Sequence, residues 1–438
     1  MADALKIGIA GLGTVGSSLV RILGERASEL ARTCGRPITI TAVSARDKSR
    51  DRGVDLSAIQ WFDSAVDMAN SADIDVFVEL MGGAEGAADQ SVRAALSRGL
   101  HVVTANKALL ARCGVELAVM AEEKGALLNY EAAVAGGIPV IKALRESLTG
   151  NTVSRVYGIM NGTCNYILTR MEKEGLSFEA CLKEAQRLGY AEADPTFDIE
   201  GNDTAHKLAI LTTLAFGTQI AADEIYLEGI SNISIEDIQA AADLGYRIKL
   251  LGVALRTDTG IEQRVHPTMV PHDSVIAQVD GVTNAVAIES DILGELLMVG
   301  PGAGGNATAS AVLGDIADIA KSRPGAQRVP VLGNPAASLA PYTQAQMQSH
   351  EGGYFIRLTV LDRAGVFADV ATRMADNGIS LESIVQRAKG AETDSKTIIL
   401  VTHATTEQSV RQAVDAIKSG TYLAGEPQVI RIERPKAF

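Results

Sequence analysis

The chain has 438 residues, of which 47% are hydrophobic and 21% are charged, and its formal net charge is −13. This length predicts two or three domains, and the strong acidity argues against a duplex nucleic-acid binder. The sequence shows neither an uncharged apolar run of about eighteen residues, as a membrane span needs, nor the layout of a signal peptide. Its four cysteines form no C-x-x-C pair, which is typical of a reducing compartment. A cytoplasmic enzyme or sensor is therefore expected.

The first 140 residues have the pattern of a nucleotide-binding sheet. A short apolar strand, a glycine turn and a helix give G-x-G-x-x-G at Gly11, Gly13 and Gly16, with Thr14 and Val15 between the last two. The first glycine permits the tight turn, the second lets the backbone approach a pyrophosphate, and the third lets helix and strand pack closely. The strands "ITITAVS", "IDVFVEL" and "HVVTANK" alternate with helical stretches. This rhythm predicts an α/β fold with a doubly wound parallel sheet of Rossmann type.

The choice of cofactor is predicted from the end of the second strand. A chain selective for NAD would place an Asp or Glu there to bind the ribose 2′-hydroxyl group. This chain has Ser44, followed by Arg46 and Lys48, whose positive charges suit a 2′-phosphate. NADP(H) is therefore the expected cofactor, with NAD(H) as the second choice, although arginines in loops also serve solubility.

The stretch "EADPTFDIEGNDTAHKLAI", residues 192–210, gathers acidic residues around one lysine where an apolar helix begins. Asp203 and Lys207 are four residues apart, so they share one face of that helix and can form an ion pair. His206 points about 100° away from Lys207 and is expected to be structural or exposed. Lys107 lies at the carboxyl end of a predicted strand, where doubly wound sheets bind ligands. An active site is one interpretation of these residues, and a solvated lead-in to a buried helix is the simpler one.

Cys164, in the turn "NGTC", raises a second hypothesis. A nucleophilic thiol could form a thioester with an aldehyde substrate, as in a phosphorylating aldehyde dehydrogenase. Such a cysteine needs a base or a helix N-terminus to lower its pKa, and the predicted helix after the turn could meet the second condition. The simpler interpretation is a small, half-buried thiol.

Six motifs in this order resemble those of homoserine dehydrogenases of the bacterial type that end in an ACT domain. The motifs are "GLGTVG", "TANKALL", "YEAAVAGGIPVI", "GIMNGTCNYILT", "GYAEADPTFDIEGNDTAHKLAIL" and "GPGAGGNATASAVLGD". They run over about the first 325 residues. The resemblance implies NAD(P)-dependent interconversion of L-homoserine and L-aspartate 4-semialdehyde, in the biosynthesis of threonine, methionine and isoleucine. A catalytically inactive NADP sensor is the alternative from another class.

The resemblance also implies roles for the lysines and acids. Lys207 would exchange the hydroxyl proton, and Lys107 would be a second cation that contacts both cofactor and substrate. A lysine beside another cation and partly desolvated releases its proton more readily. The substrate would be held by Glu192, Asp203 and Asp198.

Two further sets of residues follow from the resemblance alone. Additional contacts to the cofactor are implied at Gly189, Gly302 and Gly304. A structural monovalent cation, Na⁺, is implied at oxygen atoms of Glu131, Val134, Gly136 and Ile138. The plain alternative for this second set is a strand-to-helix connection that binds no ion.

Four segments are expected along the chain. Residues 1–137 would form the Rossmann domain, to which a helix at 305–325 returns, and 138–304 an α+β catalytic and dimerisation domain. Residues 326–350 are polar and carry prolines without periodicity, which predicts a linker. Residues 351–438 show the strand and helix order of a ferredoxin-like ACT domain.

The C-terminal segment implies regulation. ACT domains commonly pair and bind an amino acid near the first strand-to-helix loop, here Asp362 to Val366, so the resemblance implies feedback inhibition by L-threonine. The alternative is a domain kept only for assembly. A homo-oligomer, dimer or tetramer, is expected, with no nucleic-acid or membrane partner.

Overall fold

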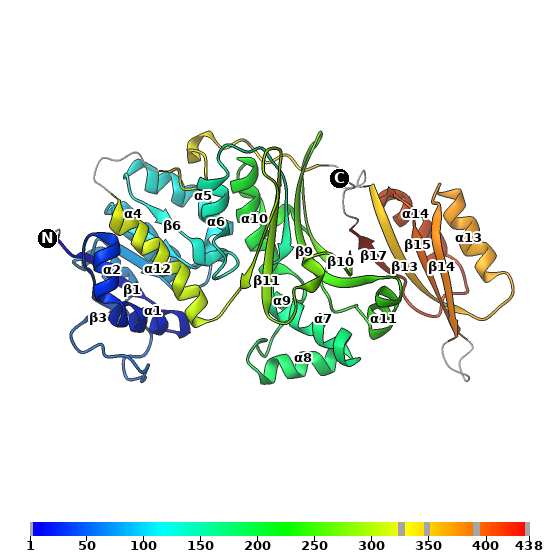
Figure 1. Ribbon diagram of the computed structural model, residues 1–438, viewed down its shortest axis with the longest axis horizontal. Helices are drawn as coiled ribbons and strands as arrows, with labels where there is room; N and C mark the ends of the chain where they lie inside the picture. Colours follow the sequence, from blue (N-terminus) through cyan, green and yellow to red (C-terminus); the bar gives the residue numbers. More distant parts are fainter. Residues whose placement is uncertain (1–2, 323–328, 346–350, 389–394, 434–438) are drawn as a thin grey trace.

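The computed structural model describes residues 3–322, 329–345, 351–388 and 395–433. Three lobes follow one another along the long axis, from a nucleotide-binding lobe at the N-terminus through a central lobe to a small C-terminal lobe (Figure 1). Among the described residues, no helix is long and apolar enough to cross a membrane. Parts of the predicted returning helix, linker and ACT segment, at 323–328, 346–350, 389–394 and 434–438, lie outside the described residues.

The N-terminal lobe is a six-stranded parallel sheet in the order β3-β2-β1-β4-β5-β6. Its strands are β1 (Leu5–Ala10), β2 (Ile38–Ser44), β3 (Gln60–Phe62), β4 (Val76–Glu79), β5 (His101–Thr104) and β6 (Leu128–Asn129). Its helices are α1 (Thr14–Glu25), α2 (Ala27–Cys34), α3 (Ala65–Ser71), α4 (Ala87–Ser97) and α5 (Lys107–Glu123). Helices on both faces explain why β1 and β4 are almost entirely apolar. The predicted doubly wound sheet is confirmed.

Helix α12 (Gly305–Lys321) packs into this first lobe although its sequence comes much later. Its buried residues Ala309, Val312 and Ile316 belong to the same apolar core as β1 and β4. Gly305 permits the close approach to α1, since a Cβ atom there would lie 2.7 Å from Ser18 Oγ. The chain thus crosses from the central lobe back to the nucleotide-binding lobe.

The central lobe is a mixed sheet covered by helices. Its strands are β7 (Val153–Ile159), β8 (Tyr226–Leu227), β9 (Tyr246–Thr257), β10 (Gly260–Pro271), β11 (Thr283–Ser290) and β12 (Gly294–Pro301). Its helical segments are η1 (Glu131–Ala133), α6 (Val140–Lys142), η2 (Ala143–Ser147), α7 (Gly162–Glu174), α8 (Phe178–Arg187), α9 (Thr196–Ile199), α10 (Asn202–Phe216), η3 (Ala222–Glu224), α11 (Ile235–Asp243) and η4 (Ile276–Gln278). Helix α10 is apolar on nearly every side because it runs through the largest core of the molecule.

The C-terminal lobe has the predicted ferredoxin-like arrangement, with its strands in the order β17-β13-β15-β14. Its elements are β13 (Glu351–Leu361), α13 (Val366–Asp376), β14 (Leu381–Ala388), β15 (Ser395–Thr402), β16 (Thr405–Thr406), α14 (Glu407–Lys418) and β17 (Gln428–Ile432). Strand β17 pairs in parallel with β10, where Thr268 faces Arg431 and Met269 faces Ile432 (Figure 1). The central and C-terminal sheets therefore form one sheet of 11 strands.

The described part of the predicted linker, residues 329–345, is not a free tether. It contains η5 (Ala336–Ser338), and the Glu122 carboxylate accepts hydrogen bonds from the backbone of Val331 and Ala336, at 3.2 and 2.9 Å. The backbone N–H of Ala345 donates to Ile261 O at 2.9 Å. The segment thus lies along the first and central lobes and delivers the chain to β13 beside the central core.

Candidate active site

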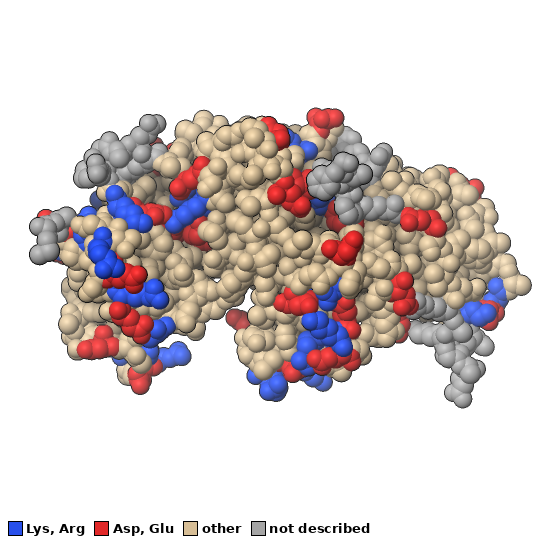
Figure 2. Space-filling model, viewed as in Figure 1, with Lys and Arg blue, Asp and Glu red and all other residues tan. Residues whose placement is uncertain are grey.

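A cavity of about 810 Å³ lies between the nucleotide-binding and central lobes. Figure 2 shows the surface hollowed at its lower edge between these two lobes, with acidic and basic side chains interspersed over the visible face. The cavity is lined by the starts of α1, α7 and α10, by the ends of β4 and β5 and by the loop between β12 and α12. The predicted site residues that line it are Val15, Lys107, Gly136, Gly189, Asp198, Asp203, Lys207, Gly302 and Gly304.

The three glycines of the N-terminal motif have three distinct geometries. Gly11 has φ of +100°, and a Cβ atom there would lie 2.5 Å from Leu80 O. A Cβ atom on Gly16 would lie 2.1 Å from Gly11 O, so this glycine lets α1 sit against the turn. A Cβ atom on Gly13 would meet no atom within 4 Å. Because Gly13 caps the N-terminus of α1, the open space beside it suits a pyrophosphate held by free N–H groups.

Asp203 lies at the centre of the polar wall of the cavity. Its Oδ2 atom is 2.6 Å from Lys207 Nζ, one helical turn along α10, and its Oδ1 atom is 3.2 Å from Lys107 Nζ, at the start of α5. Lys207 Nζ also donates to Met160 O at 2.7 Å. An ammonium group carries three N–H donors, and these two contacts leave a third that can serve a substrate oxygen. One carboxylate thus holds a lysine from each lobe at the same point.

Asn161 joins the acids to helix α7. Its Nδ2 group donates to Asp198 Oδ1 at 2.9 Å and to Asp203 Oδ2 at 2.8 Å, while its Oδ1 atom caps the helix by accepting from Cys164 N at 2.8 Å. Burial alone would raise the pKa of Asp203, but Lys207 and Lys107 outweigh burial and hold this pKa well below its usual range. Burial, and then the charge of Asp203, raise the pKa of Asp198. The two acids therefore differ in basicity although they share one amide.

The structure contradicts the hypothesis of a nucleophilic Cys164. The side chain is fully buried, and its thiol donates to Asp198 O at 3.2 Å. Burial first, and then the negative charges of Asp198 and Asp203, raise the pKa of the thiol well above its usual value. The helix N-terminus that could have activated the thiol is outweighed, so Cys164 is a packing residue.

The structure does not bring Glu192 and Arg46 to the cavity. Glu192 is exposed, and Gln186 Nε2 donates to the backbone oxygens of Glu192 and Ala193, at 3.1 and 3.3 Å. Arg46 is exposed after the end of β2. His206, as expected from its helical position, is directed elsewhere and packs edge to face on Phe197 with ring centroids 5.3 Å apart.

Arg52 is better placed than Arg46 to contact a 2′-phosphate beside the glycine turn. Its Nε group donates to Leu12 O in the glycine turn at 3.2 Å, and its guanidinium lies 5.6 Å from the centre of the Trp61 ring. Lys48 Nζ lies 5.9 Å from the same ring. Since Gly11 N donates to Ser44 O at 2.8 Å, Arg52 stands beside both the turn and the end of β2. Sequence reasoning missed Arg52 because the loop after β2 has no regular spacing.

The predicted cation turn is buried at all four positions, Glu131, Val134, Gly136 and Ile138. Ala135 and Gly136 have φ of 56° and 54°, and Ala135 is the single non-glycine residue with positive φ in the described chain. Such strain persists only where the surroundings impose it, often at functional sites. The Glu131 carboxylate already accepts from the backbone of Ile141 and Lys142, at 2.8 and 3.0 Å. Because the described residues hold no cluster of three metal-ligating side chains, this turn would offer a cation main-chain oxygens.

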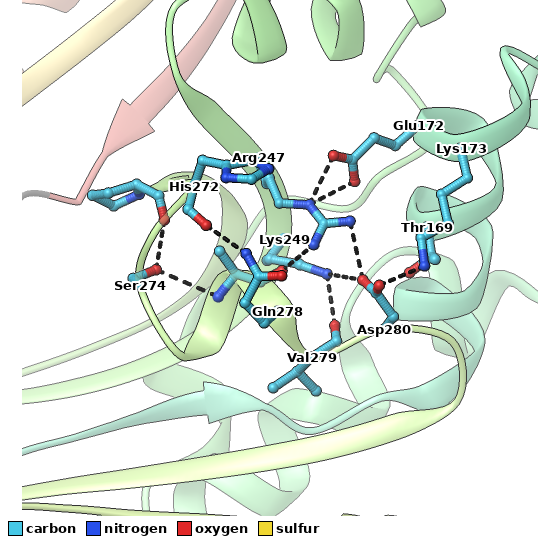
Figure 3. A network of polar contacts seen from close by, with 12 residues as sticks. Thr169, Glu172, Lys173, Arg247, Lys249, His272, Ser274, Gln278, Val279 and Asp280 are labelled. Atoms are coloured by element: carbon cyan, nitrogen blue, oxygen red, sulfur yellow. Dashed lines mark hydrogen bonds and ion pairs between the residues drawn. The ribbon is translucent and has the colours of Figure 1, made fainter.

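A buried polar network supports the cavity wall at the start of β11 (Figure 3). Lys249 Nζ donates to Val279 O at 2.7 Å, and Arg247 donates to Glu172 at 2.7 Å and to Ala277 O at 2.6 Å. Asp280 lies 3.4 Å from Lys249 Nζ and 3.1 Å from Arg247. Burial, and then the charge of Arg247, lower the pKa of Lys249 to about 8. These contacts fix residues 277–281, which lead directly to the wall.

Val282 and Asn284 follow this network and form part of the wall. A Cβ atom on Gly162 would lie 2.9 Å from Val282 O, and one on Gly302 would lie 2.0 Å from the Asn284 amide. A Cβ atom on Gly136 would lie 2.4 Å from Gly302 O. Gly302 is therefore clamped between the cation turn and Asn284, and only glycine fits there.

Other side chains of the cavity were not singled out from the sequence. Thr163 lines it and donates to Tyr190 O at 2.7 Å. Glu79, fully buried, accepts from Thr104 Oγ1 at 2.6 Å and from Met81 N at 2.7 Å. The sequence could have pointed to Thr163 because it follows a helix-capping Asn. No local sequence pattern points to Glu79, because its contacts come from the folded structure.

This fold places a nucleotide-binding glycine turn beside a cavity that holds a lysine and a carboxylate. Such a site can transfer a hydride to or from a bound nicotinamide and a proton to or from the lysine. This is the work of a nicotinamide-dependent dehydrogenase, the class that the fold and the site define.

Comparison with known proteins narrows this class. The family model for homoserine dehydrogenase matches residues 139–317, its NAD-binding domain matches 11–131, and the ACT domain matches 354–419. The chain is 44% identical to the homoserine dehydrogenase of Neisseria gonorrhoeae over 431 residues, covering 98% of each chain. It is also 44% identical to that of Pseudomonas aeruginosa over 432 residues, covering 98% of this chain and 99% of that protein. The chain belongs to the homoserine dehydrogenase family.

Solved structures agree with this assignment. A homoserine dehydrogenase from Thiobacillus denitrificans superposes with a TM-score of 0.92 at 42% identity, covering 98% of both chains. A hyperthermophilic archaeal homoserine dehydrogenase in complex with NADPH superposes with a TM-score of 0.62 at 28% identity, covering 72% of this chain and 96% of that chain. The chain is an NAD(P)-binding homoserine dehydrogenase of amino-acid biosynthesis that carries an ACT domain.

Proposed function

We propose that Lys207 is the acid–base group that exchanges the hydroxyl proton between L-homoserine and L-aspartate 4-semialdehyde. The observation that carries this role is the Asp203 carboxylate, which holds Lys207 and Lys107 at 2.6 and 3.2 Å in the cavity wall. Lys107, with a half-exposed side chain, would contact the cofactor and substrate and add a second positive charge. That charge favours the neutral amine of Lys207, the form that accepts the hydroxyl proton during alcohol oxidation.

The reaction needs two transfers. Bound nicotinamide would supply or accept the hydride at the carbon that bears the oxygen. Lys207 would take the hydroxyl proton when the alcohol is oxidised and return it to the oxygen when the aldehyde is reduced. Asp203 would keep the Lys207 amine pointed at that oxygen, and the third N–H of the ammonium form would mark its position.

The amino-acid end of the substrate would bind at the start of α7 and beside Asp198. The backbone N–H groups at Gly162 and Thr163, at a helix N-terminus, suit a carboxylate. Asp198, half-buried and lining the cavity, suits the ammonium group. Glu192 can join it only after the segment that follows α8 moves inward, so we assign Glu192 to a closed state.

Four finer properties complete the proposal. NADP(H) is the preferred cofactor, because Arg52 and Lys48 stand near the end of β2 where an acid would select NAD. The turn at 131–138 holds a monovalent cation, Na⁺, through main-chain oxygens, with a structural role. The enzyme assembles as a homo-oligomer, and the ACT domain confers inhibition by L-threonine.

A steady-state assay tests the catalytic proposal. The purified protein should reduce NADP⁺ on addition of L-homoserine and should show no such reduction with L-serine, whose shorter side chain cannot reach the same point. Asp203→Asn should lower kcat/KM roughly a thousandfold, because it removes the charge that positions both lysines. Full activity in Asp203→Asn would contradict the assigned roles of the pair.

A further inference from the structure

A second cavity, of about 380 Å³, lies between the central and C-terminal lobes. The central lobe contributes β8 and the turn after it, and the C-terminal lobe contributes α14, β17 and Tyr354 of β13. We call it the interlobe cavity. It is separate from the active-site cavity and from the ACT loop at 362–366, and it lies beside the pair β10 and β17 that joins the two sheets.

The wall of the interlobe cavity is built from charges of both signs. The Glu407 carboxylate, 5% exposed, accepts from Arg431 at 2.7 Å and from Arg411 at 2.6 Å, and Arg431 lies 3.4 Å from Glu228. Both guanidinium groups lie over the Tyr226 ring, with centres 5.5 and 5.2 Å from its centroid. Taking such ions out of water is costly. A wall that keeps them around open space is suited to a ligand that also carries both charges.

One polar atom of the wall has no partner in the protein. The Tyr354 hydroxyl is buried, on a residue only 1% exposed, and makes no hydrogen bond. A buried hydroxyl of this kind costs free energy unless something else pairs with it. The hydroxyl itself has less than 1 Å² of accessible surface, so a ligand in the cavity that Tyr354 lines can pair with it only when the ring shifts toward that ligand. A ligand that binds there would satisfy the hydroxyl group.

The interlobe cavity is one segment away from the catalytic acids. Residues 226–231 line the cavity at Tyr226 and Glu228 and then pack on the turn between α9 and α10. Ile230 N donates to Ile199 O at 2.9 Å. A Cβ atom on Gly229 would lie 2.5 Å from the same oxygen, and one on Gly201 would lie 2.9 Å from Val265 in β10. Asp198 and Asp203 flank this turn in the sequence, so the segment is in direct contact with the backbone that joins the two acids.

We propose that the interlobe cavity binds a small free amino acid and that its occupancy is transmitted through residues 226–231 to the start of α10. The ammonium group would lie against Glu228 or Glu407 and the carboxylate against Arg411, with the Tyr354 hydroxyl as a further partner. This inference rests on the proposed regulation by an amino acid and assigns that regulation to a site within one subunit. A ligand acts in this way only if it binds one arrangement of the segment better than another.

Paired substitutions in the full-length enzyme test the site. Tyr354→Phe removes a hydroxyl that has no partner in the protein, so folding, kcat and KM should stay unchanged. Calorimetry with L-threonine should show about tenfold weaker binding, the usual effect of one lost buried hydrogen bond. Arg411→Gln should weaken binding as much or more. The matched control Tyr422→Phe removes another buried hydroxyl of the same lobe, outside the cavity, and should leave binding unchanged.

The other outcomes separate this inference from the proposed function. If Tyr354→Phe and Arg411→Gln bind threonine normally while Asp362→Asn does not, the effector binds the ACT loop and the inference is wrong. If threonine does not bind but another proteinogenic amino acid does, and Tyr354→Phe weakens it, threonine regulation is wrong and the inference stands. If no amino acid raises the Tm of the wild-type enzyme, the inference is overturned while homoserine oxidation is unaffected. Amide exchange at 198–203 and 226–231 should slow when the ligand binds, and an unchanged rate at both would contradict the transmission.

Discussion

Asp203 gives this site its character at the scale of single residues. It is 5% exposed and meets Lys207, Lys107 and the Asn161 amide. A buried carboxylate is stable only with such partners, and here the partners come from three separate elements. The same contacts that make the buried charge tolerable also place two amines where a substrate oxygen can reach them.

Lys207→Ala is expected to lower kcat by roughly two to four decades, the usual contribution of a general acid–base group. KM for L-homoserine should change far less, since Asp198 and the start of α7 remain. Steady-state kinetics in both directions measure the change. The control Lys183→Ala alters an exposed lysine of α8 and should be neutral. A normal kcat with a raised KM would make Lys207 a binding residue.

Arg52→Gln should raise KM for NADP⁺ about tenfold or more and leave KM for NAD⁺ nearly unchanged, because one charge-assisted contact to the 2′-phosphate is lost. Arg46→Gln, at an exposed position, should have the smaller effect. Kinetics with both cofactors decide between the two arginines. Equal losses for NADP⁺ and NAD⁺ in Arg52→Gln would mean that Arg52 supports the glycine turn only.

At the scale of elements, rigid supports hold the cavity wall. The network of Lys249, Arg247 and Asp280 anchors the loop before β11, and β11 presents Asn284 to Gly302. The network contacts α7 at Asn165 and Glu172 and does not line the cavity, and Lys249 is 1% exposed. Its effect on catalysis is therefore indirect. The property that reports on it directly is the pH dependence of the unfolding free energy.

Lys249→Met tests this pH dependence of stability. Folding lowers the pKa of Lys249 to about 8 from its usual value of 10.5, so the cost of burying the charged amine is fully present below pH 8. That cost is relieved as pH rises toward 10.5, because the folded chain releases a proton that the unfolded chain keeps. Between pH 7 and 9.5, the wild type should gain on the order of 2 kcal/mol of unfolding free energy relative to Lys249→Met. Urea titrations measure the difference, and Lys183→Met should reproduce the wild-type slope.

Local features of the sequence predicted more of this molecule than distant ones. The glycine turn and the Asp203–Lys207 pair follow from spacings of a few residues, which backbone geometry converts directly into contacts. The meeting of Lys107 with Asp203 came only from family resemblance, because no spacing relates residues in different lobes. Polar composition marked 326–350 as a linker, yet Glu122 fixes its backbone. Composition shows that the polar groups of a segment need hydrogen-bond partners. It does not show whether those partners are water molecules or other residues of the protein.

At the scale of the whole molecule, the C-terminal lobe is joined to the central lobe by a shared sheet. Besides the β10–β17 pair, Arg357 Nη2 donates to the fully buried Asp237 of α11 at 3.1 Å. Phe355 and Ile399 belong to the core of the central lobe. An ACT domain attached in this way can transmit strain to the active-site lobe without any movement of a tether.

Removal of residues 351–438 should therefore cost stability as well as regulation. It would expose the edge of β10 and leave Arg155 without Glu433, its partner at 2.5 Å. We expect a Tm lower by several degrees and aggregation through the open edge, measured by calorimetry and size-exclusion chromatography. Arg357→Gln, which leaves the sheet intact, should lower Tm less. A soluble truncated enzyme with the wild-type Tm would show that the lobe is independent.

The sheet shared by the two lobes also sets an order of events during protein synthesis. Strand β10 ends at Pro271, but its neighbour β17 begins at Gln428, so the ribosome must add more than a hundred residues before the edge can close. At ordinary elongation rates this takes on the order of ten seconds. During that interval the nascent chain presents an open edge of β10, whose other edge is paired with β9. Chaperones or neighbouring nascent chains can bind this open edge until β17 is made. The position of β17 in the sequence therefore sets the length of that period.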